Sequence, residues 1–266
     1  MSKRTWKLGN VKPLAFAEGD RIVVGLDVHK KTVYAAVRCN GQERALWVMP
    51  MRPEIVVATL TPLKAALKKI VYEAGPTGYG LARALRKAGL PAEVVAPGKT
   101  PQSANRGSKT DRLDCRMLAE YAEKGLLKTI TIPTELEEAD RQVVRLRDQL
   151  VVKLRRAKQQ IKSLLLQQGI AEPAGLAHWT HDGIEALKQA RLSDQIRLAL
   201  DVLVEDLEHL VALKRRVEAH LSGLMKQKRH REVSRRLRSH PGVGPLTAGT
   251  FSCWPIPPWG SRPGWI

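Results

Sequence analysis

Apolar and polar positions along residues 21–130 follow two alternating periods. Short runs rich in β-branched residues predict strands over 21–28, 32–38 and 44–49, and Asn40-Gly41 predicts a hairpin turn between the last two. Helical spacing follows over 53–69, with Pro62 as a kink or a helix start, and strands over 70–73 and 92–96 flank a helix over 79–88. A further helix is predicted over 111–124. Strands followed by alternating helix and strand predict an α/β domain over 21–130.

The pattern changes after Pro133. Apolar residues recur at spacings of three and four over 135–168 and again over 185–238, while Arg and Lys occupy the other faces. This spacing predicts an antiparallel helical hairpin or a coiled coil over 131–238, and an ordinary helical bundle without a partner chain fits it equally. On or near one face of the first helix we expect Leu146, Leu150, Leu154, Ile161, Leu164 and Leu165.

Both ends of the chain lack a clear period. Residues 1–20 are predicted to be a loosely ordered arm, and 239–252 hold a Gly turn that leads into a small-residue helix, the start of a small C-terminal helical domain. Residues 253–266 are rich in Trp, Pro and Gly, a composition that GC-rich DNA encodes when it is read out of frame. We therefore predict a frameshift near residue 252 and an aberrant tail beyond it.

The net charge of the chain indicates which kinds of molecule it attracts. The chain has 45 Lys and Arg against 26 Asp and Glu, a net charge of +19, which attracts nucleic acid first and anionic membrane second. Basic solvated helices without a nucleic-acid role are the simpler alternative. No stretch reaches the roughly 18 apolar residues of a membrane span, and the N-terminus does not read as a signal peptide. Three widely spaced cysteines predict neither a disulfide framework nor a zinc site, so a cytoplasmic location is expected.

Four acidic residues stand where they could share a metal. Asp27 ends the first predicted strand, Glu73 ends a later one, and Asp111 and Asp114 share a face at the start of a helix. Two-metal sites use carboxylates that converge from different elements, and open oxygen-ligand sites favour Mg²⁺ or Mn²⁺. Such metals would activate a nucleophile and stabilise the leaving oxygen of a phosphodiester.

Each acid also has a simpler interpretation. Asp27 could simply turn the chain out of its strand, and Glu73 could pair with a neighbouring Lys such as Lys69. Asp111 could complete a capping box with Ser108, and Asp114 could pair with Arg112, Arg116 or a more distant cation.

Basic residues surround these acids. His29 follows Asp27 and more often orients or hydrogen-bonds such an acid than acts as a general base. Around the acids and in the C-terminal Gly turn, the candidates for contact with nucleic acid are Lys30, Lys31, Lys99, Arg106, Lys109, Arg112, Gly242 and Gly244.

Three acidic motifs in this order resemble a known family. Residues 25–30 (GLDVHK), 72–79 (YEAGPTGY) and 109–116 (KTDRLDCR) resemble the motifs of bacterial DEDD transposases of the insertion sequence 110 family. Residues 241–248 (PGVGPLTA) resemble the start of that family's C-terminal domain, so the likeness covers about 21–250.

The resemblance implies a RuvC-like, ribonuclease-H-type fold over 21–130, then a coiled coil and a small C-terminal domain. It implies that Asp27, Glu73, Asp111 and Asp114 form an acidic tetrad that binds Mg²⁺. It further implies a DNA recombinase that uses a structured guide RNA and forms homo-oligomers partly through the coiled coil. The family's nucleophilic serine lies well beyond the Gly turn, so that role is not transferred to Ser252 or Ser261, and defective recombination is expected.

Two other functions remain open. One is a stand-alone nuclease similar to Holliday-junction resolvases, which would cut branched DNA with Mg²⁺ and without RNA. The other is a non-catalytic nucleic-acid-binding remnant, which would show salt-dependent binding without cleavage.

Overall fold

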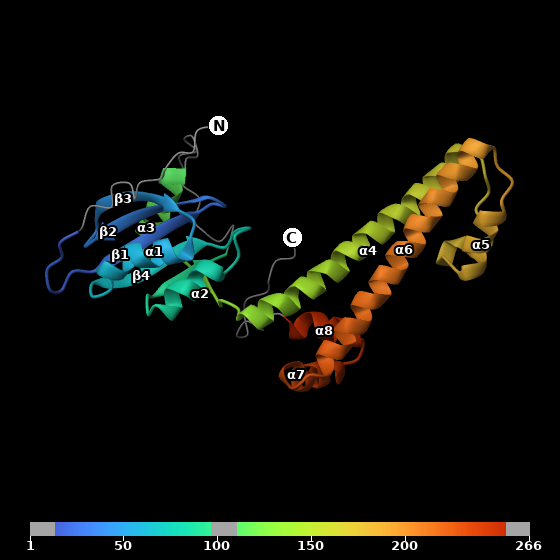
Figure 1. Cartoon of the computed structure of the whole chain (residues 1–266). Coiled ribbons are helices and arrows are strands. Elements are labelled where there is room, and N and C mark those ends of the chain that lie inside the picture. Colours follow the sequence, from blue (N-terminus) through green and yellow to red (C-terminus); the bar gives the residue numbers. More distant parts are fainter. Residues whose placement is uncertain (1–13, 97–110, 254–266) are drawn as a thin grey trace. The chain divides into compact units, whose positions relative to one another are not determined.

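The computed structural model describes residues 14–96 and 111–253, with the side chains of 111–113 left outside the description. Residues 1–13, 97–110 and 254–266 lie outside the described part. The chain divides into two compact units, Met1–Thr134 and Glu135–Ile266 (Figure 1). The first unit is built on a sheet and the second is helical, in agreement with the change of pattern after Pro133.

The first unit contains a mixed sheet. In chain order its strands are β1 (Ile22–Val28), β2 (Thr32–Cys39), β3 (Gln42–Pro50), β4 (Leu67–Glu73), β5 (Ala92–Val95) and β6 (Thr129–Ile130). Their order across the sheet is β3-β2-β1-β4-β5-β6. β1 runs antiparallel to β2 and parallel to β4, and β4 runs parallel to β5. The predicted α/β class is confirmed, whereas the short strand β6 was not predicted.

The predicted hairpin turn between β2 and β3 is present. Asn40 and Gly41 both adopt positive φ, 49° and 85°, as the two central residues of a type I′ turn require. Asn40 tolerates this backbone better than most side chains, and Gly41 adopts it without a Cβ penalty. The turn sets the register of β2 against β3.

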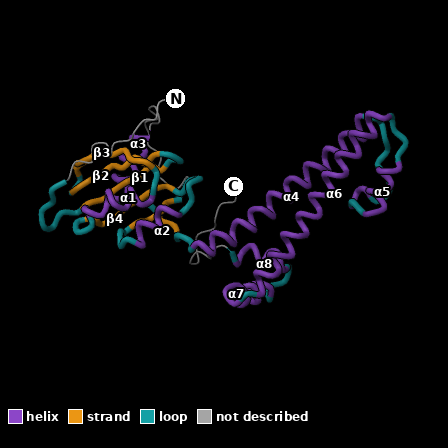
Figure 2. The backbone as a smooth tube through the Cα atoms, in the orientation of Figure 1, coloured by secondary structure: helices purple, strands orange, loops and turns teal. Residues whose placement is uncertain are grey.

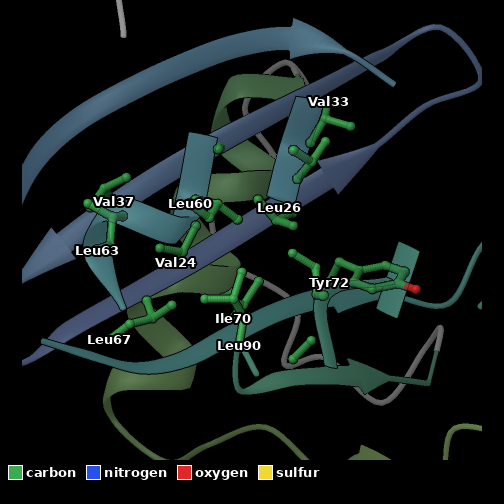
Figure 3. Close-up of a cluster of buried hydrophobic side chains, with 14 of the residues drawn as sticks. Val24, Leu26, Val33, Val37, Leu60, Leu63, Leu67, Ile70, Tyr72 and Leu90 are labelled. Atoms are coloured by element: carbon green, nitrogen blue, oxygen red, sulfur yellow. The ribbon is translucent and has the colours of Figure 1, made fainter. Parts of the chain in front are cut away.

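Helices cover both faces of the sheet. α1 (Pro53–Leu60) and α2 (Gly80–Lys87) pack on one face, and α3 (Asp111–Glu123) packs on the other. Figure 3 shows the core under α1, where side chains from β1, β2 and β4 converge. That core includes Val24, Leu26, Val33, Val37, Leu60, Leu63, Ile70 and Tyr72, all at most 2% exposed.

The predicted helix over 53–69 is wrong beyond its first half. α1 ends at Leu60, a 3₁₀ turn covers Thr61–Leu63, and β4 already begins at Leu67. Pro62 lacks the N–H that a continuing helix needs, so the chain leaves the helix there. Leu67 is buried as part of the sheet core, which explains why its apolar spacing resembled the helix before it.

The predicted arm over 1–20 is packed in its described part. Leu14 and Phe16 lie against the sheet core, and the Asp20 carboxylate accepts hydrogen bonds from the Ala17 amide at 2.9 Å and the Asn40 side chain at 2.8 Å. Residues 14–20 are therefore ordered against the sheet rather than loosely attached.

The second unit is a long helical hairpin with three smaller helices. α4 (Glu135–Gln167) and α6 (Asp194–Lys226) lie side by side, with α5 (His181–Gln189) near one end and α7 (Lys228–Arg238) and α8 (Pro245–Ser252) near the other (Figure 2). The two long helices share a core that includes Leu150, Leu154, Ile161, Leu165, Leu200, Val204 and Leu207. The predicted antiparallel hairpin is present, and the coiled coil stays a prediction.

Several details of the second unit differ from the sequence prediction. The helical stretch over 185–238 is broken twice, between α5 and α6 and at Gln227, whose ψ of 147° is extended. Leu146 is 46% exposed and does not share the buried face of α4. Cys253, assigned to the aberrant tail, is buried against Val144 and Leu221, and the remaining tail residues lie outside the described part. Among the described residues, no helix has the length and apolar composition to cross a bilayer.

Candidate metal and nucleic-acid site

Asp27 and Glu73 come from neighbouring parallel strands. The register of β1 against β4 pairs Leu26 with Tyr72, so the next residue of each strand, Asp27 and Glu73, lies at the same carboxyl edge. Parallel strands present their carboxyl ends together, which brings two acids that are distant in sequence into adjacent positions.

Both acids also lie on the same face of the sheet. Successive strand residues point to opposite faces, and Leu26 and Tyr72 belong to the core under α1. Asp27 and Glu73 therefore point to the opposite face, where Val23 packs with Leu118 of α3. Asp27 has a side chain only 19% exposed, whereas Glu73 is exposed. The carboxylates thus face the side of the sheet that α3 covers.

A glycine in β1 lets α3 approach closely. A β-carbon on Gly25 would collide with the Cys115 carbonyl oxygen and the Ala119 amide nitrogen, both backbone atoms of α3. Only glycine fits this contact without moving the helix. The close approach brings the first half of α3, which carries Asp114, to the strand that ends in Asp27.

Cys115 shows how closely α3 approaches Asp27. Burial, together with the negative charge of Asp27, raises the pKa of the Cys115 thiol to about 12. The thiol therefore stays protonated at neutral pH and is not a nucleophile. Its role is to fill the interface between α3 and β1, together with Ala36 and Ala119.

Ion pairs at the edges of the sheet hold α3 in place. Arg116 donates two hydrogen bonds to Glu43 of β3, each 2.8 Å long. At the end of the helix, Glu123 accepts hydrogen bonds from Arg38 and from the Gly41 amide, both at 2.7 Å. α3 is thus fixed against β2 and β3 at two points, which fixes the position of Asp114.

His29 and Tyr34 complete the surroundings of Asp27. His29 Nε2 lies 3.0 Å from Asp27 Oδ2, and since an ionised carboxylate only accepts, the imidazole is the donor. The Tyr34 ring stands edge-on to His29, with 6.1 Å between centroids, and Tyr34 pairs with Asp27 across β1 and β2. The expected orienting contact of His29 is confirmed. Tyr34 was missed, although the hairpin register would have indicated it.

The segment after Glu73 is held from within the core. The hydroxyl of buried Tyr72 accepts a hydrogen bond from the Ala82 amide at 3.2 Å and lies 3.4 Å from the Gly78 carbonyl oxygen. Gly78 has φ of 68°, which favours glycine. Tyr72 therefore ties the turn after β4 to α2 and fixes the chain that leaves Glu73.

Two of the simpler pairings of the acids are not formed, while a pairing of Asp114 with Arg112 lies outside the described side chains. Lys69 pairs with Glu93 of β5 at 3.2 Å rather than with Glu73. Arg116 pairs with Glu43 rather than with Asp114. These cations are therefore engaged elsewhere and do not neutralise the two candidate ligands.

The remaining predicted site residues divide into exposed ones and undescribed ones. Lys30 and Lys31 are exposed in the connection between β1 and β2, next to Asp27. The side chains of Asp111 and Arg112 lie outside the described part, although both residues belong to the first turn of α3. Lys99, Arg106 and Lys109 also lie outside it.

The donors present are hard oxygen ligands, which suit Mg²⁺ or Mn²⁺. Within the described residues, no three His, Cys, Asp or Glu side chains stand close enough together to hold a metal ion.

Comparison with known proteins identifies the family. A family model described as a transposase, of the DEDD type named for insertion sequence 110, matches residues 24–169. The chain belongs to this transposase family. The matched residues include β1 with Asp27, β4 with Glu73, and the whole of α3.

Individual relatives carry the same description. A *Sinorhizobium fredii* (strain NBRC 101917 / NGR234) protein described as a transposase is 30% identical over 92% of this chain and 62% of its own length. The transposase for insertion sequence element IS1533 of *Leptospira borgpetersenii* is 28% identical over 88% of this chain and 69% of its own. The chain thus spans roughly two thirds of the length of these relatives.

Among solved structures, *T. thermophilus* RuvC in complex with a Holliday junction substrate is similar to this chain. It is 15% identical, and the match covers 41% of this chain and 99% of that one, with a TM-score of 0.28.

The Gly turn of this chain lies beyond the segment that the family model matches. Gly242 has φ of 82°, and Gly244 is the N-cap of α8 with Pro245 as its first residue. The predicted turn followed by a helix is confirmed. The contact of Gly242 and Gly244 with nucleic acid stays a prediction.

Proposed function

We propose that this chain binds DNA and contributes to cutting and joining DNA strands during transposition of an insertion sequence. The observation that carries the proposal is the pairing of Asp27 and Glu73 at one sheet edge, on the face that α3 covers. Membership of a transposase family supports a DNA substrate. The strand order β3-β2-β1-β4-β5 with a parallel β1–β4 pair supports the ribonuclease-H-type, RuvC-like assignment of the first unit.

In this proposal Asp27, Glu73, Asp111 and Asp114 hold Mg²⁺ or Mn²⁺. When bound, the metal supplies a polarised oxygen nucleophile and stabilises negative charge on the leaving oxygen. His29 orients the Asp27 carboxylate through its 3.0 Å hydrogen bond. The exposed Lys30 and Lys31 contact the phosphate backbone beside the acids.

A structured guide RNA and a second copy of the chain are further proposed partners. The net charge of +19 supports binding of more than one nucleic-acid strand. Exposed apolar residues on the long helices support self-association: Leu166 is 81%, Leu198 67% and Val202 55% exposed.

The test is a titration of the purified chain with Mn²⁺, in which electron paramagnetic resonance measures the bound and free metal. Asp27→Asn and Asp114→Asn should each weaken Mn²⁺ binding about tenfold or more, since each removes a charged ligand. Glu120→Gln is the matched control, because Glu120 lies on α3 but is paired with Lys124.

Nicking of branched DNA with Mg²⁺ provides the second readout. It should fall in Asp27→Asn and Asp114→Asn and stay unchanged in Glu120→Gln. The proposal is wrong if Asp27→Asn binds Mn²⁺ as tightly as the parent chain. Cleavage of branched DNA by the chain alone, without RNA, would favour a stand-alone nuclease over a guided recombinase.

A further inference from the structure

The second unit contains a cleft bounded by α6, α7 and α8. Its volume is about 870 Å³. The lining combines cations with aliphatic residues, three serines (Ser222, Ser234 and Ser239) and Glu232. The cations are Lys226, Arg231, Arg235 and Arg238, and the aliphatic residues include Leu221, Met225, Pro245 and Leu246. The four cations against one carboxylate suit an anionic ligand.

The charge of the cleft is only partly neutralised. α7 has six Lys or Arg and one Glu among its 11 residues. That Glu232 pairs with Arg235 at 3.0 Å and Arg236 at 2.8 Å, and these arginines lower its pKa to about 2. Among the described residues, no ion pair engages Lys226, Arg231 or Arg238. The cleft therefore keeps an excess of positive charge.

The cations of α7 form a row along one face. Arg231, Arg235 and Arg238 are spaced by four and three residues, the spacing of neighbours on a helix surface. With a rise of about 1.5 Å per residue the row is about 10 Å long, enough to contact more than one phosphate of a DNA strand.

The orientation of this row is fixed from the other side of α7. Arg229 donates hydrogen bonds of 2.8 and 2.9 Å to both oxygens of Asp140 of α4, and His230 Nε2 lies 2.8 Å from the same carboxylate. Asp140 and His230 are 4% and 5% exposed. Since α7 is anchored through residues 229 and 230, residues 231, 235 and 238 are held toward the cleft.

α8 adds a partial positive charge to its own wall of the cleft. Pro245 and Leu246, the first residues of α8, line the cleft, so the N-terminal end of the helix borders it. The unpaired amides of a first helical turn attract anions. The two walls therefore favour the same kind of ligand.

We propose that the cleft between α6, α7 and α8 binds the sugar–phosphate backbone of duplex DNA. The proposal rests on the DNA-directed function proposed above and adds a second contact site in the other unit. DNA is the proposed occupant because the function proposed above acts on DNA strands, and the unpaired cations of the cleft match a phosphate backbone. Contacts of this kind hold the duplex without reading its sequence.

The test compares two charge-matched double variants in fluorescence anisotropy with duplex DNA over a series of salt concentrations. Arg231→Gln with Arg238→Gln removes two cations from the cleft, and Arg215→Gln with Arg216→Gln removes two exposed cations of α6 that do not line it. The cleft variant should bind at least tenfold more weakly and should reduce the slope of log K against log salt by about 2. The control should change both quantities much less.

Leu246→Glu is an independent variant at a half-exposed position, 36% exposed, and should weaken DNA binding by adding an anion to the cleft. Circular dichroism of each variant checks that the helical unit stays folded. Equal loss in both double variants would overturn the proposal in favour of a general charge effect. Loss of affinity for duplex RNA but not for DNA would overturn the choice of DNA.

Failure of the cleft and failure of the metal site give different results. If the cleft variant keeps its DNA affinity while Asp27→Asn loses Mn²⁺, the cleft proposal is wrong and the metal site stands. If the cleft variant loses DNA affinity while Asp27→Asn keeps Mn²⁺, the cleft stands and the metal assignment is wrong.

Discussion

The two units position a functional helix by opposite physical means. In the first unit, α3 rests on β1 backbone to backbone, because Gly25 has no side chain at the point of contact. In the second, α7 is attached to α4 through a buried carboxylate, Asp140, and the cations Arg229 and His230. The contact of α3 with β1 depends on the missing side chain at Gly25, and the attachment of α7 to α4 depends on the neutralisation of charge at Asp140. They should therefore respond to different substitutions.

The largest effect is expected from Gly25→Val in the first unit. A side chain at this position meets backbone atoms of Cys115 and Ala119, which cannot rotate away as a flexible side chain would. Overpacking costs about 1–3 kcal/mol where neighbours yield, so the loss here should exceed about 3 kcal/mol of unfolding free energy. Chemical denaturation followed by circular dichroism measures it.

Gly80→Ala is the matched control for Gly25→Val. Gly80 begins α2, and a β-carbon there meets no atom within 4 Å. Its substitution should change the unfolding free energy by less than about 1 kcal/mol. A loss below about 1 kcal/mol for Gly25→Val would show that α3 does not depend on this close contact.

The second largest loss of unfolding free energy is expected from removing the buried carboxylate of Asp140 in the helical unit. Asp140→Ala leaves Arg229 and His230 without their carboxylate, and removing one partner of a buried ion pair costs about 3–5 kcal/mol. Because the Arg229 side chain is 32% exposed, water offsets part of this, and a loss of about 2–3 kcal/mol is expected. Glu208→Ala, which breaks an exposed pair with Lys188, should cost less than about 1 kcal/mol.

The contribution of the Asp140 carboxylate to the unfolding free energy should depend on pH. Burial alone would raise the pKa of Asp140, but hydrogen bonds from Arg229 and His230 outweigh it and hold that pKa below the ordinary value. The stabilisation is therefore complete above the unfolded pKa of about 3.9 and is lost as the pH falls through the lower folded pKa. The difference in unfolding free energy between the parent chain and Asp140→Asn should shrink below about pH 4. A difference that grows toward acid would contradict this assignment.

How far the sequence predicts each contact depends on whether its signal is local. The turn at Asn40-Gly41 and the acids at the ends of β1 and β4 are local signals, and the structure has both. Gly25 was also readable, because a glycine inside a strand marks close backbone approach. The attachment of Asp140 to Arg229 and His230 joins residues about ninety positions apart, and no period or motif connects them.

Breaks in the helices were the other limit of prediction. The chain leaves α6 at Gln227, where neither Gly nor Pro interrupts the apolar spacing, so periodicity continued through the break. Pro62 did give a signal, but the buried Leu67 of β4 fitted the preceding helical spacing by chance. In both places tertiary packing decides the backbone, and a one-dimensional pattern does not report it.

The smallest effects should come from the ion pairs that hold α3 at the sheet edges. Glu123→Ala removes the acceptor of both Arg38 and the Gly41 amide, at a site where the two side chains are 18% and 22% exposed. Glu43→Ala removes only the ion-pair partner of Arg116, whose side chain is 44% exposed. We expect losses of about 1–2 kcal/mol for Glu123→Ala and less than about 1 kcal/mol for Glu43→Ala.

The effects of these two substitutions should also differ in their dependence on salt concentration. Raising the salt concentration from about 0.1 M to 1 M shortens the screening length from about 10 Å to 3 Å, which weakens exposed pairs most. The effect of Glu43→Ala on the unfolding free energy should therefore vanish in 1 M salt, while most of the effect of Glu123→Ala should remain, because a hydrogen bond to the hairpin backbone is lost as well. If both effects vanish together, α3 is held by Gly25 and its apolar neighbours alone, and the edge contacts only orient side chains.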